Sequence, residues 1–316
     1  MQSKGVRRAR SGRTIQIPDH RRCIKSLTGM PRYLLFTDLD GSLLDNDTYS
    51  FDEAKPALHT LQSQDIPVIL VSGKTRAEIE PLRERLNHQA PFIVENGAAV
   101  YVPIETFDFT PERSRRRSSY HVIELGTPYA LLRDVLRQIE IAVGTRLRGF
   151  GDLSVDEVMT TTGLSREDAL RAMLREFDEP FLVNGPPRLI EEICRQIVAR
   201  DLSWTKGGRF FHLTGKNDKG RAADILLRCY RRQGRDHEED NLETIGIGDS
   251  LNDLPLLLMV DHPILVQKPD GTYDPDINLP NLIRAPGIGP TGWNRAVIEL
   301  LQQVTEQMPD GRPLRI

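Results

Sequence analysis

The sequence predicts an α/β protein, with a doubly wound parallel sheet interrupted by an inserted α+β domain. Short apolar runs with almost no polar alternation recur toward both ends of the chain, and such runs are typical of strands buried on both faces. Amphipathic helical segments separate the runs, as in βαβ units. The alternation stops after residue 103 and returns near residue 219, so we expect a second, smaller domain between these points.

The first part of the pattern is a strand–helix–strand–helix–strand order with tight connections. Both helices repeat apolar residues at helical spacing, and the strands are short apolar runs. We predict strands at residues 33–37, 67–71 and 92–94, and helices at residues 52–64 and 75–87.

The middle of the chain has a less regular pattern. The polar and basic residues 113–119 are expected to form a linker or an exposed turn, and Ser165 is expected to begin a helix that runs to Phe177. Glu176, Asp178 and Glu179 are interpreted as the solvated acidic end of that helix, with contacts to the hydroxyl groups of a ligand as the alternative. We predict further strands at residues 181–183 and 209–213, around a helix at residues 187–200.

The α/β pattern then resumes, with predicted helices at residues 219–231 and 293–303 and predicted strands at residues 244–247 and 264–266. The domain division that follows is a core of residues 31–103 and 215–316 and an inserted cap of residues 104–214. Residues 1–30 carry many Lys and Arg residues against a single acid, Asp19. We expect a mostly disordered basic tail, with a targeting segment as the alternative.

The composition excludes several classes of protein. The 39% hydrophobic and 28% charged residues are typical of a soluble globular chain, and no apolar run approaches the ~20 residues of a spanning helix. The net charge of -3 gives no reason to expect a nucleic-acid or membrane partner. The 3 cysteines are too few and too scattered for a disulfide framework or a zinc site. We expect a cytoplasmic protein, and no oligomeric state is indicated.

Two acidic loops follow predicted strands. Asp38 and Asp40 come directly after the first strand, in the sequence Asp-Leu-Asp-Gly-Ser, and Asp249 and Asp253 follow a later buried strand. Ligands of open parallel sheets bind beyond the carboxyl ends of the strands, so the two loops can meet there if their strands are neighbours. Clustered carboxylates repel one another unless a cation is present, and Mg²⁺ prefers such oxygen ligands. A magnesium site with open positions for a phosphate is therefore predicted.

Two further segments suit a phosphoryl group. Ser72, Gly73 and Lys74 end the second predicted strand, where a hydroxyl and backbone N–H groups can bind phosphate oxygens. A lysine at the start of the helix near residue 219 can neutralise developing charge. Both Lys216 and Lys219 lie close to this point, and Lys219 is favoured because it directly precedes Gly220 and the helix.

In this order along the chain, the four segments resemble the motifs of the haloacid dehalogenase superfamily of phosphatases. The resemblance implies a Rossmann-like core with an inserted cap, and catalysis by Asp38, Asp40, Ser72 and Lys219. It implies that Asp38 attacks phosphorus to give an aspartyl-phosphate, while Asp40 acts as acid and then base. It assigns Mg²⁺ to Asp38, the backbone carbonyl of Asp40 and Asp249, with Asp253 either binding the metal or orienting Lys219.

A narrower resemblance lies in four short motifs, which are similar to those of mannosyl-3-phosphoglycerate phosphatases. The motifs are residues 73–78, 94–98, 208–212 and 289–293. The implied substrate is a small phosphorylated glycosylglycerate, and the implied product is mannosylglycerate, a compatible solute.

The narrower resemblance also implies substrate-binding residues in both the core and the cap. Arg209 is a candidate partner for the glycerate carboxylate, because guanidinium pairs bidentately with that group. Side chains alternate along a strand, so His212 is expected on the opposite face from Arg209 unless a bulge intervenes. The residues implied to bind substrate are Ser72, Gly73, Lys74, Arg209, His212 and Asn252.

Other functions are compatible with the same residues. A glucosyl-3-phosphoglycerate phosphatase, another phosphosugar phosphatase or a phosphomannomutase-like phosphotransferase would use the same fold. A protein of another class, which senses phosphate or binds nucleic acid through the basic tail, would not need the complete set of acids and Lys219.

Overall fold

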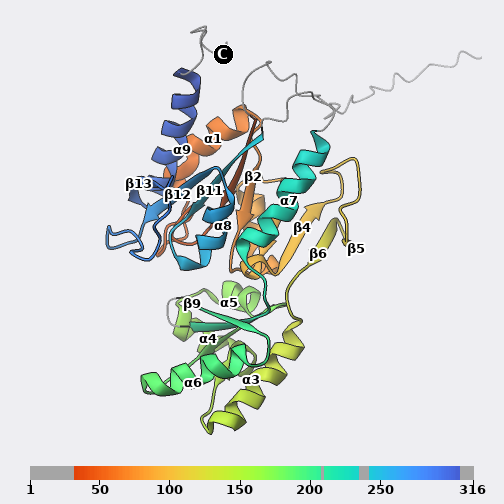
Figure 1. The fold of residues 1–316 in the computed structure, drawn as a ribbon, viewed down its shortest axis with the longest axis vertical. Coiled ribbons are helices and arrows are strands. Elements are labelled where there is room, and N and C mark those ends of the chain that lie inside the picture. The colour runs from red at the N-terminus through yellow and green to blue at the C-terminus, as the bar shows by residue number, and fades with distance from the viewer. Residues whose placement is uncertain (1–31, 208–209, 235–241, 307–316) are drawn as a thin grey trace, which may run out of the picture. The chain divides into compact units, whose positions relative to one another are not determined.

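The computed structural model describes residues 32–207, 210–234 and 242–306, so the predicted basic tail lies outside the described residues. Two sheets organise the chain (Figure 1). The large sheet has nine strands, in the spatial order β13 (Ile283–Ile288), β12 (His262–Gln267), β11 (Leu242–Gly248), β1 (Arg32–Thr37), β2 (Val68–Val71), β3 (Phe92–Val94), β4 (Ala99–Pro103), β6 (Tyr120–Glu124) and β5 (Arg115–Arg117).

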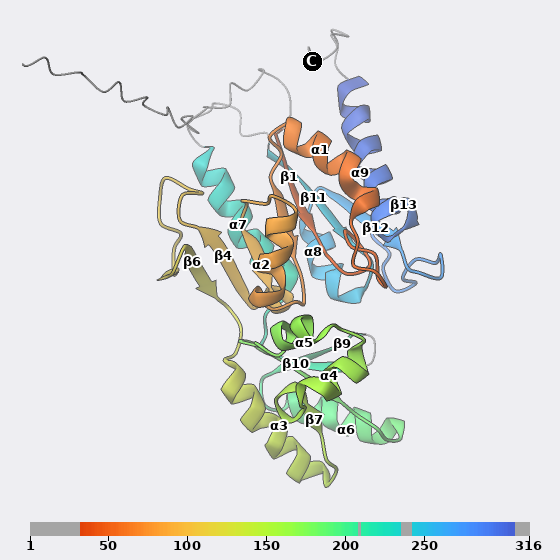
Figure 2. The same ribbon diagram turned by 180° about the vertical axis from the view of Figure 1, so that it is seen from behind.

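The part of the large sheet from β13 to β3 is parallel, and β1 lies between β11 and β2. Side chains of β1 are buried on both faces, with Leu35 in one apolar cluster and Leu34 and Phe36 in the other. Figures 1 and 2 show helices on the two faces of this sheet. One face is covered by α1 (Lys55–Ser63), α2 (Arg76–Arg85) and α9 (Gly289–Glu306), and the other by α7 (Lys219–Gln233) and α8 (Leu254–Met259).

These features confirm the predicted fold class, a doubly wound parallel sheet with a separate α+β element. The strands predicted at residues 33–37, 67–71 and 92–94 are β1, β2 and β3. In the described part of the chain, no helix is long and apolar enough to span a membrane.

The prediction that residues 113–119 form a linker or turn was wrong in part. Residues Arg115–Arg117 form strand β5, which pairs antiparallel with β6 at the edge of the large sheet. Its three arginines are exposed, and charged side chains are typical of edge strands because they discourage pairing with another chain. The large sheet therefore extends to Glu124, beyond residue 103, where the cap was predicted to begin.

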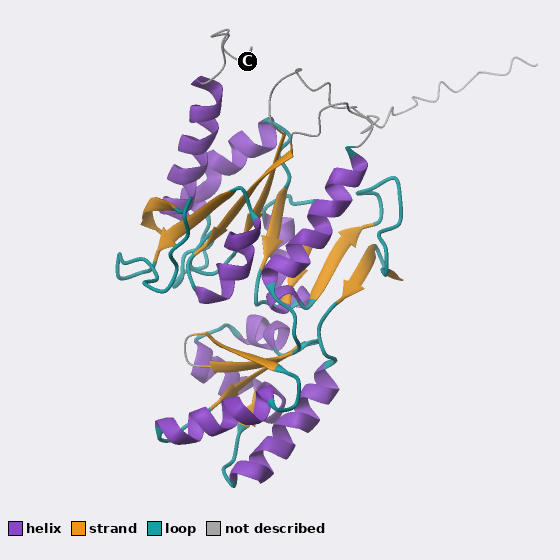
Figure 3. Cartoon of the chain, in the orientation of Figure 1, coloured by secondary structure: helices purple, strands orange, loops and turns teal. Residues whose placement is uncertain are grey.

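The second sheet is antiparallel, in the order β7 (Arg148–Gly149), β8 (Asp178–Leu182), β10 (Phe210–Thr214) and β9 (Ser203–Gly207). Figure 3 shows helices packed around it. Apolar side chains of α3 (Tyr129–Val143) and α6 (Pro187–Val198) share a cluster with Phe181, Phe211 and Leu213. A separate cluster joins α4 (Val155–Thr162) and α5 (Arg166–Ala172), with Phe210 packed against it. We refer to this sheet and its helices as the cap.

The helix predicted to run from Ser165 to Phe177 ends at Ala172, and Leu174, beyond its end, is exposed. Asp178 and Glu179 are fully buried in β8, so their interpretation as a solvated helix end was also wrong. The reason lies in the turn after β3, where the carboxylate of Glu95 accepts the backbone N–H groups of residues 176 and 177. These two N–H groups are thereby held out of the helix.

Four short 3₁₀ turns complete the described secondary structure. They are η1 (Asp52–Ala54), η2 (Glu95–Gly97), η3 (Phe150–Asp152) and η4 (Leu251–Asp253).

Candidate active site

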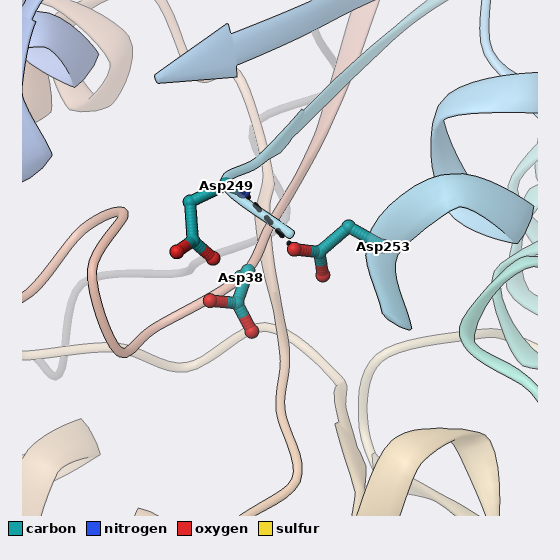
Figure 4. Close-up of side chains that lie close together, drawn as sticks. All are labelled: Asp38, Asp249 and Asp253. Carbon is teal, nitrogen blue, oxygen red and sulfur yellow. Dashed lines mark hydrogen bonds between the residues drawn. The ribbon is translucent and has the colours of Figure 1, made fainter. Parts of the chain in front are cut away.

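The loops that follow β1 and β11 meet at the carboxyl edge of the sheet, because the two strands are parallel neighbours. Asp38, Asp249 and Asp253 each offer a carboxylate oxygen, and these oxygens lie within 4.8 Å of one another. Figure 4 shows the three carboxylates close together, with that of Asp253 directed at the backbone nitrogen of Asp249. Gly41 has φ +76°, and a Cβ there would lie 3.0 Å from Oδ2 of Asp249. The turn after β1 thus needs glycine to let the second acidic loop approach.

Lys219 is fully buried among these acids. Its Nζ donates to Oδ1 of Asp38 and to Oδ1 of Asp253, both at 2.5 Å. The lysine opens helix α7, and the next residue, Gly220, packs against α8 so closely that a Cβ would lie 2.2 Å from the carbonyl oxygen of Pro255. The close packing of α7 and α8 positions the ammonium group.

The two lysines considered for this position lie in different surroundings. Lys216 is exposed and forms an ion pair with Asp201, outside the acidic cluster. Lys219 is the one that contacts Asp38.

The acids and the lysine shift each other's ionisation. Burial raises the pKa of Asp38 well above its ordinary value; Lys219 opposes this shift and Asp253 adds to it. Burial likewise raises the pKa of Asp249 to about 6, with repulsion from Asp253 as the next cause. Although burial lowers the pKa of Lys219, Asp253 and Asp38 raise it more, and the net shift is upward. The cluster thus holds more negative charge than one ammonium group neutralises.

The loop after β2 joins the same edge. Ser72 is buried, and its Oγ accepts the N–H of Lys74 at 3.1 Å. The Nζ of Lys74 lies 2.9 Å from Oδ2 of Asp40 and 4.7 Å from the centre of the Tyr49 ring. Lys74 therefore connects the Ser72–Gly73–Lys74 loop with the loop that carries Asp38 and Asp40.

The loop after β11 is held by Asp253. Its Oδ2 accepts the backbone N–H groups of Asp249 (3.0 Å) and Ser250 (3.2 Å), while its Oδ1 faces Lys219. The side-chain amide of Asn252 lies 3.4 Å from Oδ1 of Asn96, so this loop also touches the turn after β3.

The motif at residues 289–293 lies at the start of α9. Trp293 is fully buried, and its Nε1 donates to Oγ1 of Thr37 at 2.9 Å, directly before Asp38. This residue supports the end of β1 from the face opposite α7.

Of the two cap residues predicted to bind substrate, Arg209 lies outside the described residues. His212 is on β10, and its Nδ1 lies 2.8 Å from Oδ2 of the buried Asp178. Because side chains alternate along a strand, His212 shares a sheet face with Phe210, on the side where α4 and α5 pack. A cleft of about 190 Å³ separates part of the cap from the core, and its lining includes Lys74, Asp168 and Arg171.

Glu95 and Arg175 were not singled out from the sequence. Glu95 lies in the motif at residues 94–98, but nothing in that motif indicates that its side chain is buried against the cap. Arg175 Nη1 donates to the carbonyl oxygen of Gly73 at 2.9 Å. Both residues form hydrogen bonds between the cap and the core, and no short sequence motif predicts such a contact.

The residues present fit a hard divalent cation. The donors of this acidic cluster are carboxylate oxygens, which are the ligands that Mg²⁺ prefers, and their mutual repulsion would be relieved by a cation. Oδ1 of Asp40 is buried and has no hydrogen-bond partner among the described residues. The site can thus bind a metal ion and, beside it, an anion.

Comparisons with known proteins agree with this geometry. Residues 35–112 match the family model described as haloacid dehalogenase-like hydrolase. A protein from Methanococcoides burtonii is 45% identical over 270 residues, which cover 85% of this chain and 97% of that protein. The chain belongs to the haloacid dehalogenase-like hydrolases. The relative is named glucosyl-3-phosphoglycerate/mannosyl-3-phosphoglycerate phosphatase.

Two further relatives of this chain carry related names. A Persephonella marina protein with the same name is 38% identical and covers 86% of this chain and 98% of that protein. A Pyrococcus horikoshii protein named mannosyl-3-phosphoglycerate phosphatase is 35% identical and covers 74% and 90%.

Solved structures show the same fold. A Thermoplasma acidophilum protein superposes with a TM-score of 0.60 at 17% identity, covering 88% of this chain and 100% of that one. A haloacid dehalogenase-like hydrolase from Bacteroides thetaiotaomicron gives a TM-score of 0.58 at 14% identity, covering 86% and 99%.

Proposed function

We propose that this protein is a Mg²⁺-dependent phosphatase that hydrolyses mannosyl-3-phosphoglycerate and its glucosyl counterpart to the glycosylglycerate and inorganic phosphate. The observation that carries the proposal is the position of Asp38, which lies at the carboxyl end of β1 between Lys219 and Asp249. Relatives that match nearly their whole length and bear these substrate names support the choice of substrate.

Asp38 is the nucleophile in this proposal. Its carboxylate oxygen attacks phosphorus, the bond from phosphorus to the ester oxygen breaks, and an aspartyl-phosphate forms. Asp40 donates a proton to the departing alkoxide of glycerate. It then takes a proton from the water that attacks the aspartyl-phosphate, so that phosphate leaves and Asp38 is restored. Proton transfer of this kind contributes about 10²–10⁴ in rate.

Lys219 and Asp253 hold the nucleophile in place. The ammonium group of Lys219 lies against Oδ1 of Asp38, which limits the directions in which the carboxylate can turn. Asp253 orients Lys219 through Oδ1 and fixes the loop after β11 through Oδ2. Because both carboxylate oxygens of Asp253 already have partners, we assign this residue to the orientation of Lys219 rather than to metal binding.

Mg²⁺, held by Asp38, the carbonyl of Asp40 and Asp249, would neutralise the charge between an anionic nucleophile and an anionic phosphate. The phosphoryl oxygens would be bound by the hydroxyl of Ser72, backbone N–H groups beside Gly73, and Lys74. Although burial lowers the pKa of Lys74, the neighbouring carboxylates, that of Asp40 first, raise it more, so this lysine is charged and suits the role.

Recognition of the glycosylglycerate is assigned to the cap. The cleft beside Lys74 has acidic and aromatic lining from Tyr49, Glu78 and Asp168, which suits the hydroxyls and the ring face of a sugar. Arg209 is kept as the partner of the glycerate carboxylate and His212 as a second contact.

The test is phosphate release by the purified full chain with Mg²⁺. The substrates are the two glycosyl-3-phosphoglycerates, 3-phosphoglycerate and several hexose phosphates, and the Asp38→Asn variant is the blank. We expect the highest kcat/KM on the glycosyl-3-phosphoglycerates. A higher kcat/KM on a hexose phosphate, or transfer of phosphate to a second sugar in place of its release, would contradict the proposal.

A further inference from the structure

The loop proposed to bind phosphate is attached to the cap by hydrogen bonds in both directions. Oγ1 of Thr75 donates to the carbonyl oxygen of Arg171 at 3.0 Å, and Nη1 of Arg175 donates to that of Gly73 at 2.9 Å. Figures 1 and 2 both show α5 on the side of the cap that faces the large sheet, where it contacts α2. The segment 171–178 is therefore the cap's contact with the phosphate loop.

Glu95 makes the second connection from the core. Its buried carboxylate accepts the N–H groups of Glu176 (3.0 Å) and Phe177 (2.8 Å), and its own N–H donates to the carbonyl oxygen of Lys74 at 3.0 Å. Glu95 has φ +46°, in the left-handed region that residues other than glycine avoid. Such a conformation persists when surrounding contacts hold it, as these three hydrogen bonds do.

Arg175 is buried and charged, so its guanidinium group requires polar or acidic partners. Its guanidinium also lies 3.2 Å from Oδ2 of Asp178, and that oxygen lies 2.8 Å from Nδ1 of His212. The other ionisable groups that face Arg175 are Glu78, Glu95 and Tyr129. A chain of polar contacts thus connects His212 in the cap sheet, through Asp178 and Arg175, with the carbonyl of Gly73.

We propose that Arg175 of the cap and Glu95 of the core are positioning residues, which together set the orientation of the two peptide groups on either side of Lys74. Arg175 holds the carbonyl of Gly73, and the backbone N–H of Glu95 holds the carbonyl of Lys74, so the peptide groups on both sides of Lys74 are fixed while the cap segment is in place. The N–H of Lys74 then stays directed at Ser72. The inference rests on the proposed function for the assignment of this loop to phosphate binding.

The test compares Arg175→Met with Arg166→Met in the full chain. Arg166 is an exposed arginine of α5, the helix that precedes Arg175, and it is paired with Asp156, so it serves as the matched control. We expect Arg175→Met to lower kcat on p-nitrophenyl phosphate and to weaken inhibition by inorganic phosphate, each by about ten- to hundredfold. Amide hydrogen exchange of residues 70–76 should become faster, while exchange in β11 stays unchanged. Arg166→Met should match the wild type in all these measurements.

The Glu95 side is tested by a conservative pair. Glu95→Gln keeps an oxygen that can accept the N–H groups of residues 176 and 177, whereas Glu95→Ala removes both acceptors. We expect Glu95→Ala to behave like Arg175→Met, and Glu95→Gln to restore most of the phosphate affinity. Equal losses in the two Glu95 variants would overturn the assignment of these hydrogen bonds.

Unchanged phosphate inhibition and unchanged exchange at residues 70–76 in folded Arg175→Met would overturn the inference. If that variant does not fold, Arg175→Lys keeps the charge but not the planar fork, and wild-type behaviour there would overturn it equally. The exchange measurement needs no substrate. If the wild type is inactive on glycosyl-3-phosphoglycerates but exchange at residues 70–76 is still faster in Arg175→Met, the proposed function is contradicted and this inference is supported.

Discussion

The ammonium nitrogen of Lys219 lies 2.5 Å from Oδ1 of Asp38, and both side chains are buried at the carboxyl edge of the sheet. The pair joins residues 181 positions apart in the sequence. Each of the two buried charges stabilises the other, because an unpaired charge in a site without water raises the free energy of the folded state. The same lysine faces Asp253, so its removal would leave three neighbouring carboxylates without their cation.

Lys219→Met should therefore lose activity and stability together. We expect kcat to fall by about 10³-fold or more, and the free energy of unfolding to fall by about 3–5 kcal/mol. Lys216→Met is the matched control, because Lys216 is exposed and pairs with Asp201. Phosphate-release assays and urea unfolding of both variants check this. Loss of activity in Lys216→Met and not in Lys219→Met would contradict the assignment.

Asp38→Asn keeps the size of the side chain but removes the attacking charge. We expect turnover to fall by about 10⁴-fold or more while the circular dichroism spectrum stays that of the wild type. Rapid-quench detection of a phosphorylated wild-type chain, missing in the variant, is the complementary measurement. A variant of verified sequence with near-normal kcat would exclude Asp38 as the nucleophile.

Chelation should stop the reaction. The clustered carboxylates of Asp38, Asp249 and Asp253 repel a phosphate dianion unless a cation lies among them. We expect EDTA to abolish phosphate release, Mg²⁺ to restore it, and Mg²⁺ to raise the Tm of the substrate-free protein, since it binds the folded state. Asp249→Asn should need more Mg²⁺ for half-maximal activity. Full activity after exhaustive chelation would show that these acids serve another purpose.

The sequence predicted the acidic edge well because the relevant information is local. A buried strand followed by two acids is visible in a short window, and the parallel pairing of β1 and β11 then brings Asp38 and Asp249 together. The choice of Lys219 over Lys216 followed from the adjacent Gly220, which the structure shows packed against α8.

The cap was predicted less well because its burial depends on distant residues. Asp178 and Glu179 have the composition of a solvated helix end, yet both are buried and paired with Arg175 and Arg133. The helix before them stops early because Glu95, about eighty positions away, takes two backbone N–H groups. Neither fact leaves a periodic signal in the sequence.

The free energy of unfolding should depend on pH through the titration of Glu95. Burial raises the pKa of this carboxyl to about 7, whereas in the unfolded chain it ionises near its ordinary value of about 4.3. The folded state therefore holds the proton more tightly than the unfolded state. The contribution of Glu95 to stability is fully present below the unfolded pKa of about 4.3, and it is lost as the pH rises through the folded pKa of about 7.

Comparing wild type with Glu95→Gln isolates this contribution, because all other groups titrate in both proteins. We expect the free energy of unfolding of the wild type, relative to the variant, to be smaller at about pH 8 than at about pH 5. Urea unfolding at the two pH values measures it. A difference that is independent of pH, or that grows as pH rises, would contradict the raised pKa.

Arg209→Ala separates recognition from chemistry. The core residues act on a phosphate monoester that reaches them, so preference for glycosyl-3-phosphoglycerates is expected to reside in the cap. Losing a buried ion pair with the glycerate carboxylate costs about 2–5 kcal/mol, so kcat/KM on these substrates should fall by several decades. Hydrolysis of p-nitrophenyl phosphate should change little, because that ester has no carboxylate.

Arg195→Ala, at an exposed arginine of α6, is the matched control. Equal losses of Arg209→Ala on both substrates would assign Arg209 to the fold or the metal site, and no loss on either would remove it from the active site.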